Sequence, residues 1–236
     1  MTILDPRQVS EFSTNGFVVT PGLLSSEELD HYAEAVDAAV TQRTLDDQRT
    51  LAEKPAYEQS FIQCMRLWET DPAVAPLTFH PALAQAATEL LGVESVLLWQ
   101  DQALYKEPGG RITDPHQDAP LWPIGDAPLV SAWIPFDGST EADGALGYVP
   151  GSHLAGALDV VDLMNDPCDI LSDPALAGVG PQRVEVPRGS ILWHHGMTVH
   201  EAAANRSDRK ELNRPGFDGG SAYWFPTPVG EGSLAA

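Results

Sequence analysis

The chain has 236 residues, of which 43% are hydrophobic, and we expect one domain over residues 1–236 with a single buried core. Asp and Glu outnumber Lys and Arg by 34 to 13, and the resulting net charge of −21 argues against nucleic acid as a partner. The sequence shows neither a secretion signal nor an apolar run near the roughly 18 residues of a membrane span. It therefore predicts a soluble, cytoplasmic protein with no membrane partner, in which Cys64 and Cys168 are buried, reduced thiols.

The N-terminal third is predicted to be mainly helical. Residues 6–14 are expected to form a short helix, and residues 17–24 a brief apolar strand that Pro and Gly interrupt. Ser25 lies three residues before Glu28, which is the spacing of a capping box at the start of a longer helix. Apolar residues then recur at helical intervals on one face: Leu29, Tyr32, Ala33, Val36 and Val40. Another helix is expected over residues 81–91, before a Gly that would end it.

From Val93 onward the sequence predicts mostly β-structure. Short runs rich in Val, Leu, Trp and Tyr alternate with Pro and Gly turns, as in SVLLWQDQALY, PLVSAWIPF and SILWHHGMTVH. Helices first and many short strands afterwards predict an α+β fold, with helices packed on the outside of a sandwich or barrel of strands. The turn-rich loop over residues 163–180 is expected to cover one end of this barrel, and the tail over residues 230–236 to be disordered.

An H-x-D pair indicates a metal site. His116 and Asp118 follow a turn-rich segment, and on an extended strand residues i and i+2 point to the same face, so both could hold one ion. A third ligand must come from elsewhere, and His200 ends the apolar strand MTVH much further along the chain. Two imidazoles and one carboxylate form the facial triad that holds iron(II) and leaves other positions open.

Other histidines compete for the third position. His195, on the strand before His200, is the runner-up. His194 or His195 is otherwise expected to be a core residue or a residue that supports the site, and His153 is expected to end a turn where it hydrogen-bonds exposed backbone. His31 on the first long helix and His80 before the next helix are not expected to reach the metal.

Three segments of the sequence resemble the phytanoyl-CoA dioxygenase family of 2-oxoglutarate oxygenases: DPHQDAPLWPI, SAWIPFDGSTEADGALGYVPGSH and WHHGMTVHEAAANRSDR. The resemblance runs from Phe17 to Arg209, and its most specific parts are H-Q-D, G-A-L-x-x-V-P-G-S-H and H-x(4)-N-R-S-D-R. It implies a double-stranded β-helix core of the jelly-roll, cupin-like type. It also implies His116, Asp118 and His200 as the iron(II) ligands, with 2-oxoglutarate and O2 as co-substrates.

The resemblance further implies an arginine that binds the far carboxylate of 2-oxoglutarate, roughly ten residues after the second His ligand, because a guanidinium group pairs with a carboxylate in bidentate geometry. The usual arginine directly before an apolar strand is absent here. Arg209 and Arg214 are both candidates, with Arg206 a weaker one. On the strand LLWQDQALYK, Gln102 or Lys106 is expected to hydrogen-bond a co-substrate carboxylate, as similar positions do in the family.

Three more residues are expected at the pocket. Thr113 and Trp133 resemble pocket-lining positions of related enzymes, although plain core packing explains a Trp such as Trp133 equally well. Trp122 follows the H-x-D pair closely and is expected to face the substrate.

The expected activity is hydroxylation, or another oxidation, of an unactivated C–H bond in a small-molecule metabolite, with release of succinate and CO2. Because Asp118 is a carboxylate rather than Ala or Gly, halogenation is disfavoured. A polar or cationic metabolite is favoured over an acyl-CoA, whose phosphates would prefer basic residues. Two alternatives stay open: a cupin-like metal enzyme that does not use 2-oxoglutarate, and a non-catalytic β-helix domain that binds a ligand.

Overall fold

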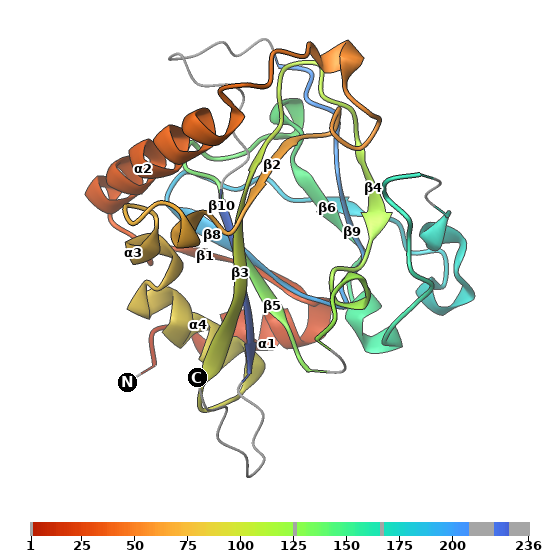
Figure 1. The fold of residues 1–236 in the computed structure, drawn as a ribbon. Coiled ribbons are helices and arrows are strands. Elements are labelled where there is room, and N and C mark those ends of the chain that lie inside the picture. Colours follow the sequence, from red (N-terminus) through yellow and green to blue (C-terminus); the bar gives the residue numbers. More distant parts are fainter. Residues whose placement is uncertain (1, 125–126, 166–167, 208–219, 227–236) are drawn as a thin grey trace.

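The computed structural model describes residues 2–124, 127–165, 168–207 and 220–226, and its α-helices all precede the main run of strands (Figure 1). They are α1 (Pro6–Asn15), α2 (Ser26–Thr44), α3 (Ala75–Thr78) and α4 (Pro81–Leu91). The predicted capping box is present, since the Ser25 hydroxyl accepts the Glu28 N–H at 3.2 Å and the Glu28 carboxylate accepts the Ser25 N–H at 2.8 Å. Gly92 ends α4 with φ 67°, a left-handed conformation that Gly adopts without steric cost.

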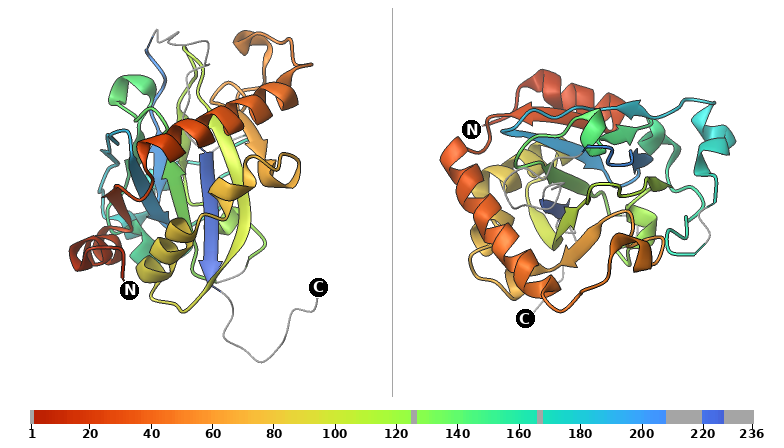
Figure 2. Two further views of the ribbon diagram at one scale, coloured as in Figure 1. Left: turned by 90° about the vertical axis from the view of Figure 1, so that its left-hand side faces the viewer. Right: turned by 90° about the horizontal axis from the view of Figure 1, so that it is seen from above.

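The strands form two antiparallel sheets (Figures 1 and 2). The six-stranded sheet has the order β1 (Phe17–Pro21), β8 (Ser190–His195), β5 (Val130–Ile134), β10 (Gly220–Pro226), β3 (Val96–Tyr105) and β2 (Ile62–Met65). The four-stranded sheet has the order β4 (Thr113–His116), β9 (His200–Ala202), β6 (Leu146–Tyr148) and β7 (Gln182–Arg183). This mixture of helices and antiparallel sheets agrees with the predicted α+β class.

The two faces of the six-stranded sheet pack against different parts of the protein, because successive side chains of a strand point to opposite sides. One face packs against the helices, which lie across it in Figure 2, and forms the main core. Trp193 of β8 belongs to this core, is completely buried, and donates its indole N–H to Thr20 at 2.8 Å. Its neighbour His194 points to the other face, where Trp133 of β5 is also buried. The second face is therefore the one turned toward the four-stranded sheet and the pocket.

The loop that was expected to cover the barrel has a small core of its own. It contains two short 3-10 helices, Ile170–Ser172 and Pro174–Leu176. Ile170 and Leu176 pack with Val161 against Val149 and Val199, and Val199 directly precedes His200. This apolar cluster ties the loop to the strand that carries a candidate ligand.

The two cysteines differ in their exposure to solvent. Cys64 is buried as predicted, but Cys168 is exposed, so the prediction of two buried thiols was wrong for Cys168. Cys168 lies in the loop outside both sheets, where no sheet face covers it. None of the helices in the described residues is long and apolar enough to cross a membrane.

A pair of imidazoles joins α1 to the sheet. The His195 ring lies 5.5 Å from the His153 ring and 6.4 Å from the Phe12 ring of α1, measured between centroids. The His195 Nδ1 accepts the Met197 N–H at 3.1 Å. Burial, helped by the neighbouring His153 and His194, lowers the pKa of His195 to about 4. The folded protein therefore keeps this side chain neutral at pH values where an unfolded chain would protonate it.

This shift predicts a specific loss of stability in acid. Below pH 6.5 the unfolded state binds a proton that folded His195 resists down to about pH 4, so the free energy of unfolding falls as the pH decreases through this window. Both His195→Phe and His195→Gln should make the fall shallower, by up to about 1.36 kcal/mol per pH unit, because neither side chain titrates. Denaturant unfolding of the metal-free protein at several pH values checks this, and slopes unchanged in both variants would refute it.

Candidate metal centre and active site

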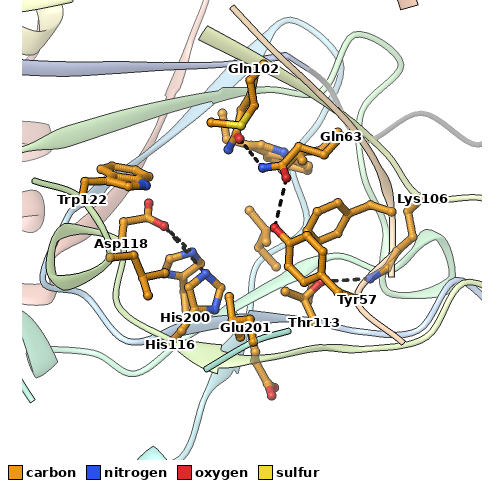
Figure 3. Close-up of a pocket in the computed structure, with 18 of the residues that line it drawn as sticks. Tyr57, Gln63, Gln102, Lys106, Thr113, His116, Asp118, Trp122, His200 and Glu201 are labelled. Atoms are coloured by element: carbon orange, nitrogen blue, oxygen red, sulfur yellow. Dashed lines mark hydrogen bonds and ion pairs between the residues drawn. The ribbon is translucent and has the colours of Figure 1, made fainter. Parts of the chain in front are cut away.

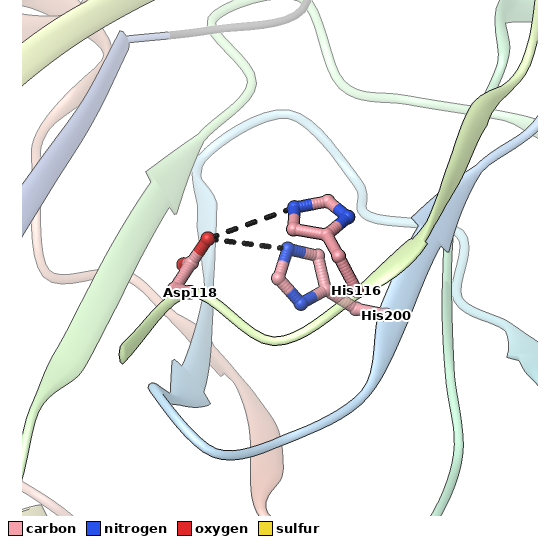
Figure 4. Close-up of side chains that lie close together, drawn as sticks. All are labelled: His116, Asp118 and His200. Carbon is pink, nitrogen blue, oxygen red and sulfur yellow. Dashed lines mark ion pairs between the residues drawn. The ribbon is translucent and has the colours of Figure 1, made fainter. Parts of the chain in front are cut away.

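Pairing between β4 and β9 creates the centre of the site. The two strands are antiparallel, and His116 lies directly opposite His200. Asp118 follows β4 by two residues, where the chain turns into a short 3-10 helix. All three side chains are buried, and the ligand atoms that they offer lie within 4.8 Å of one another (Figure 4). The Asp118 Oδ1 atom is 3.7 Å from the His116 Nε2 and 3.8 Å from the His200 Nε2.

Backbone carbonyls fix the orientation of both imidazoles. The His116 Nδ1 lies 2.7 Å from the Asp114 carbonyl oxygen, and the His200 Nδ1 lies 3.0 Å from the Thr198 carbonyl oxygen. A carbonyl only accepts, so in each ring Nδ1 carries the proton, and in the neutral ring the lone pair is on Nε2, toward Asp118. This arrangement of a metal-binding His with its second nitrogen on a carbonyl is common in metalloproteins.

The protonation of the three groups suits a metal ion. Burial, together with the nearby His200, lowers the pKa of His116 to about 4, and burial also lowers the pKa of His200 to about 4. Burial alone would raise the pKa of Asp118, but His200 and the hydrogen bond to His194 outweigh it, and this pKa lies below its usual range. At neutral pH the site therefore offers two neutral imidazole nitrogens and a carboxylate, the donor set that fits iron(II) in a facial triad.

The two histidines of β8, His194 and His195, point to opposite faces of the sheet. The His194 Nε2 lies 3.0 Å from the second carboxylate oxygen of Asp118, so His194 contacts a candidate ligand. His195, the runner-up for the third ligand, points toward α1 and His153 instead. Among the described residues, the cluster able to hold a metal ion contains His200 and not His195.

A cavity of about 120 Å³ extends from these residues between the two sheets. It is lined from both sheets, and four of its lining residues are Gln102, Lys106, Thr113 and Trp122 (Figure 3). Trp133 also lines it, while it packs in a small core with Phe17, Tyr148 and Leu192. Both roles that the sequence left open for Trp133 apply.

Two sets of hydrogen-bonded polar side chains lie on the cavity wall. In the first, the Tyr57 hydroxyl donates to the Gln63 side chain at 3.1 Å, and the Gln63 amide donates to Gln102 at 2.7 Å. In the second, the fully buried Lys106 ammonium donates to the Thr113 hydroxyl at 3.4 Å (Figure 3). A basic side chain and several hydrogen-bonding groups therefore line a mostly apolar cavity, a composition that small-molecule pockets commonly have.

Several of these residues were not predicted from sequence. Tyr57, Phe61 and Gln63 come from a stretch where no strand was expected, and Gln63 reaches the cavity because β2 pairs with β3. Tyr57 and Phe61 precede β2, and Leu163 lines the cavity from the covering loop. No sequence motif marks these positions, since tertiary packing brings them to the cavity.

Gln117, the middle residue of H-Q-D, has a role that its position did not reveal. Its side-chain amide donates to the carbonyl oxygens of Gly156 at 2.9 Å and Met197 at 2.6 Å, and its side-chain oxygen accepts the Leu158 N–H at 2.9 Å. The residue between the two candidate ligands thus connects the segment that precedes the covering loop to the turn before His200.

The structure describes one of the three candidate arginines, Arg206. Arg209 and Arg214 lie outside the described residues. Arg206 is described and exposed, and it does not line the cavity. The weaker candidate is therefore not part of the site as described.

Comparisons with known proteins identify the family of the chain. The family model of phytanoyl-CoA dioxygenase (PhyH) matches residues 12–212. Phytanoyl-CoA dioxygenase domain-containing protein 1 of Bos taurus is 24% identical over 261 residues, covering 89% of this chain and 88% of that protein.

Solved structures with the same fold are also similar. The α-ketoglutarate-dependent carbocyclase SnoK of nogalamycin biosynthesis superposes with a TM-score of 0.79 at 24% identity, covering 95% of this chain and 85% of SnoK. The epimerase SnoN, solved with Fe3+, α-ketoglutarate and nogalamycin RO, gives a TM-score of 0.71 at 25% identity, covering 93% of this chain and 82% of SnoN. The resemblance noted in the sequence is thereby confirmed, together with its cofactors, Fe(II), 2-oxoglutarate and O2. The chain belongs to the phytanoyl-CoA dioxygenase family of iron(II)- and 2-oxoglutarate-dependent oxygenases.

Proposed function

We propose that His116, Asp118 and His200 hold iron(II), and that the protein hydroxylates or otherwise oxidises an unactivated C–H bond of a small molecule while 2-oxoglutarate becomes succinate and CO2. The observation that carries the proposal is the buried His, Asp and His cluster at the wall of a cavity between the sheets. Bound iron(II), with 2-oxoglutarate and O2, supplies the oxidising power that side chains lack. The protein supplies ligands, orientation and exclusion of water.

The fold supports this proposal through the order of its strands. Between β3 and β10 the chain crosses repeatedly from one sheet to the other. The six-stranded sheet contains β3, β5, β8 and β10, and the four-stranded sheet contains β4, β6, β7 and β9. We interpret these eight strands as the double-stranded β-helix, with the helices outside it, and the whole chain as one domain. In this architecture the two sheets face each other and enclose a site between them.

The wall residues receive roles from their chemistry. To Gln102, Lys106 and Thr113, which line the cavity, we assign hydrogen bonds to a carboxylate of 2-oxoglutarate, and to the ring of Trp133 a contact with its carbon chain. Trp122, beside the ligands, faces the substrate. Arg209 or Arg214 pairs with the far carboxylate of the co-substrate.

The substrate is proposed as a small-molecule metabolite. SnoN was solved with nogalamycin RO and is an epimerase, whereas SnoK is a carbocyclase, so enzymes with a similar fold carry out different reactions. Hydroxylation is our default outcome among these. The acidic net charge favours a polar or cationic metabolite over an acyl-CoA, and the absence of a nucleic-acid partner and a cytoplasmic location stay predictions.

The ligand assignment predicts the behaviour of three variants. His116→Ala, Asp118→Ala and His200→Ala should each lose stoichiometric iron and iron-dependent succinate formation while they remain folded, because each removes one of three ligands from the site. Iron content by elemental analysis, succinate by mass spectrometry and circular dichroism check this. His195→Ala is the matched control and should keep its iron. Full iron binding by His200→Ala, or loss of iron in His195→Ala alone, would contradict the assignment.

The co-substrate anchor gives another prediction. Arg209 ends the N-R-S-D-R motif, so we expect Arg209→Ala to raise the dissociation constant of 2-oxoglutarate by about a hundredfold, since losing a charge-assisted pair costs a few kcal/mol. Iron binding should change little. Arg214→Ala is the matched control, and its 2-oxoglutarate affinity should stay near that of the wild type. Anaerobic titration measures both, and the opposite ranking of the two variants would assign the anchor to Arg214.

A further inference from the structure

The two carboxylate oxygens of Asp118 face different groups. Oδ1 is the oxygen nearest to both ligand imidazoles, at 3.7 Å from the His116 Nε2 and 3.8 Å from the His200 Nε2. Oδ2 lies 3.0 Å from the His194 Nε2 and 3.3 Å from the Ser131 hydroxyl, which donates to it. Only one oxygen is thus turned toward the candidate metal position, and the other is held on the opposite side.

The contact to His194 continues as a chain of hydrogen bonds. A carboxylate only accepts, so the His194 Nε2 donates to Asp118. In the neutral ring Nδ1 is then an acceptor, and the Tyr148 hydroxyl, 3.1 Å away, donates to it. Each donor in Tyr148, His194 and Asp118 therefore meets an acceptor in one consistent direction.

Packing keeps this chain in place. His194 and Tyr148 are 4% and 0% exposed, and the Tyr148 ring stacks on Phe17 with 4.8 Å between ring centroids. Turning the His194 ring away would leave buried polar atoms without partners, which costs free energy. The carboxylate of Asp118 is consequently fixed by groups that are themselves fixed.

We propose that His194 is a positioning residue that holds Asp118 so that Oδ1 alone is presented to the metal. This inference rests on the proposed function, in which Asp118 is a ligand. A carboxylate can also bind an ion through both oxygens, and doing so would use a coordination position that the co-substrates require. Because Oδ2 accepts the hydrogen bond from His194, binding of the ion through both oxygens is disfavoured. This proposal gives His194, the middle residue of Trp-His-His in β8, a function.

His194 is not itself placed as a fourth ligand. Its Nε2 donates to Asp118 and its Nδ1 accepts from Tyr148, so neither nitrogen has a lone pair left for an ion. The next residue, His195, is the natural control, because its side chain lies on the other face of the same strand.

The test is a titration of the metal-stripped, full-length protein with Co(II), whose visible absorption reports its ligands. His194→Phe removes the hydrogen bond and should weaken Co(II) binding by about 10- to 100-fold and change the spectrum. His194→Gln retains an amide donor and should restore most of the affinity. Tyr148→Phe keeps the stacked ring, removes only the hydroxyl, and should show a smaller loss. His195→Phe should match the wild type in affinity and spectrum.

The outcomes separate the inference from the function on which it rests. If the wild type binds Co(II) and His116→Ala does not, but His194→Phe equals the wild type, the positioning role is refuted and the ligand assignment survives. If His194→Gln is as weak as His194→Phe, a hydrogen-bond donor is not what matters, and the role is refuted as well. If the wild type binds no Co(II), both the positioning role of His194 and the ligand assignment are refuted. Thermal unfolding confirms that each variant is folded, and His194→Leu replaces His194→Phe if the latter is not.

Discussion

The pairing of β4 with β9 is the constraint on which the site depends. It places His116 opposite His200, with their ring centroids 4.3 Å apart, although 83 residues of chain separate the two. A slip of one residue in this register would turn one imidazole to the other face of the sheet. The apolar cluster around Val149 and Val199 packs directly behind β9, and Gln117 joins the H-Q-D segment to the turn before it. The metal centre is therefore held by neighbours that specify the register.

Burial determines the chemistry of this centre. The three side chains are almost free of solvent, so their imidazoles stay neutral and the carboxylate is held ionised by hydrogen bonds and nearby rings. An uncompensated carboxylate in such a place would be costly. His194 and Ser131 offset part of that cost, and a bound cation would offset the rest. The same features that disfavour an uncompensated carboxylate support the proposed divalent-ion site.

Sequence alone predicted the parts of the protein that local pattern encodes. The Ser25 capping box, the helix over residues 81–91 and the H-x-D pair each depend on residues close together in the chain, and the structure contains all three elements. Gln63, Gln117 and His194 could not be assigned in the same way. Their roles come from pairing between distant strands and from contacts across loops, for which a single sequence carries no periodic signal. Exposed Cys168 was predicted wrongly because a turn-rich loop gives no pattern of burial.

The most direct test of the proposed function is an anaerobic mixture of the metal-free protein with iron(II) and 2-oxoglutarate, followed by visible absorption. We expect a weak charge-transfer band that requires all three of protein, iron(II) and 2-oxoglutarate, and that disappears in Asp118→Ala. A protein that binds iron(II) at this site but develops no such band, at saturating 2-oxoglutarate, would refute the proposal that the site binds 2-oxoglutarate on iron(II).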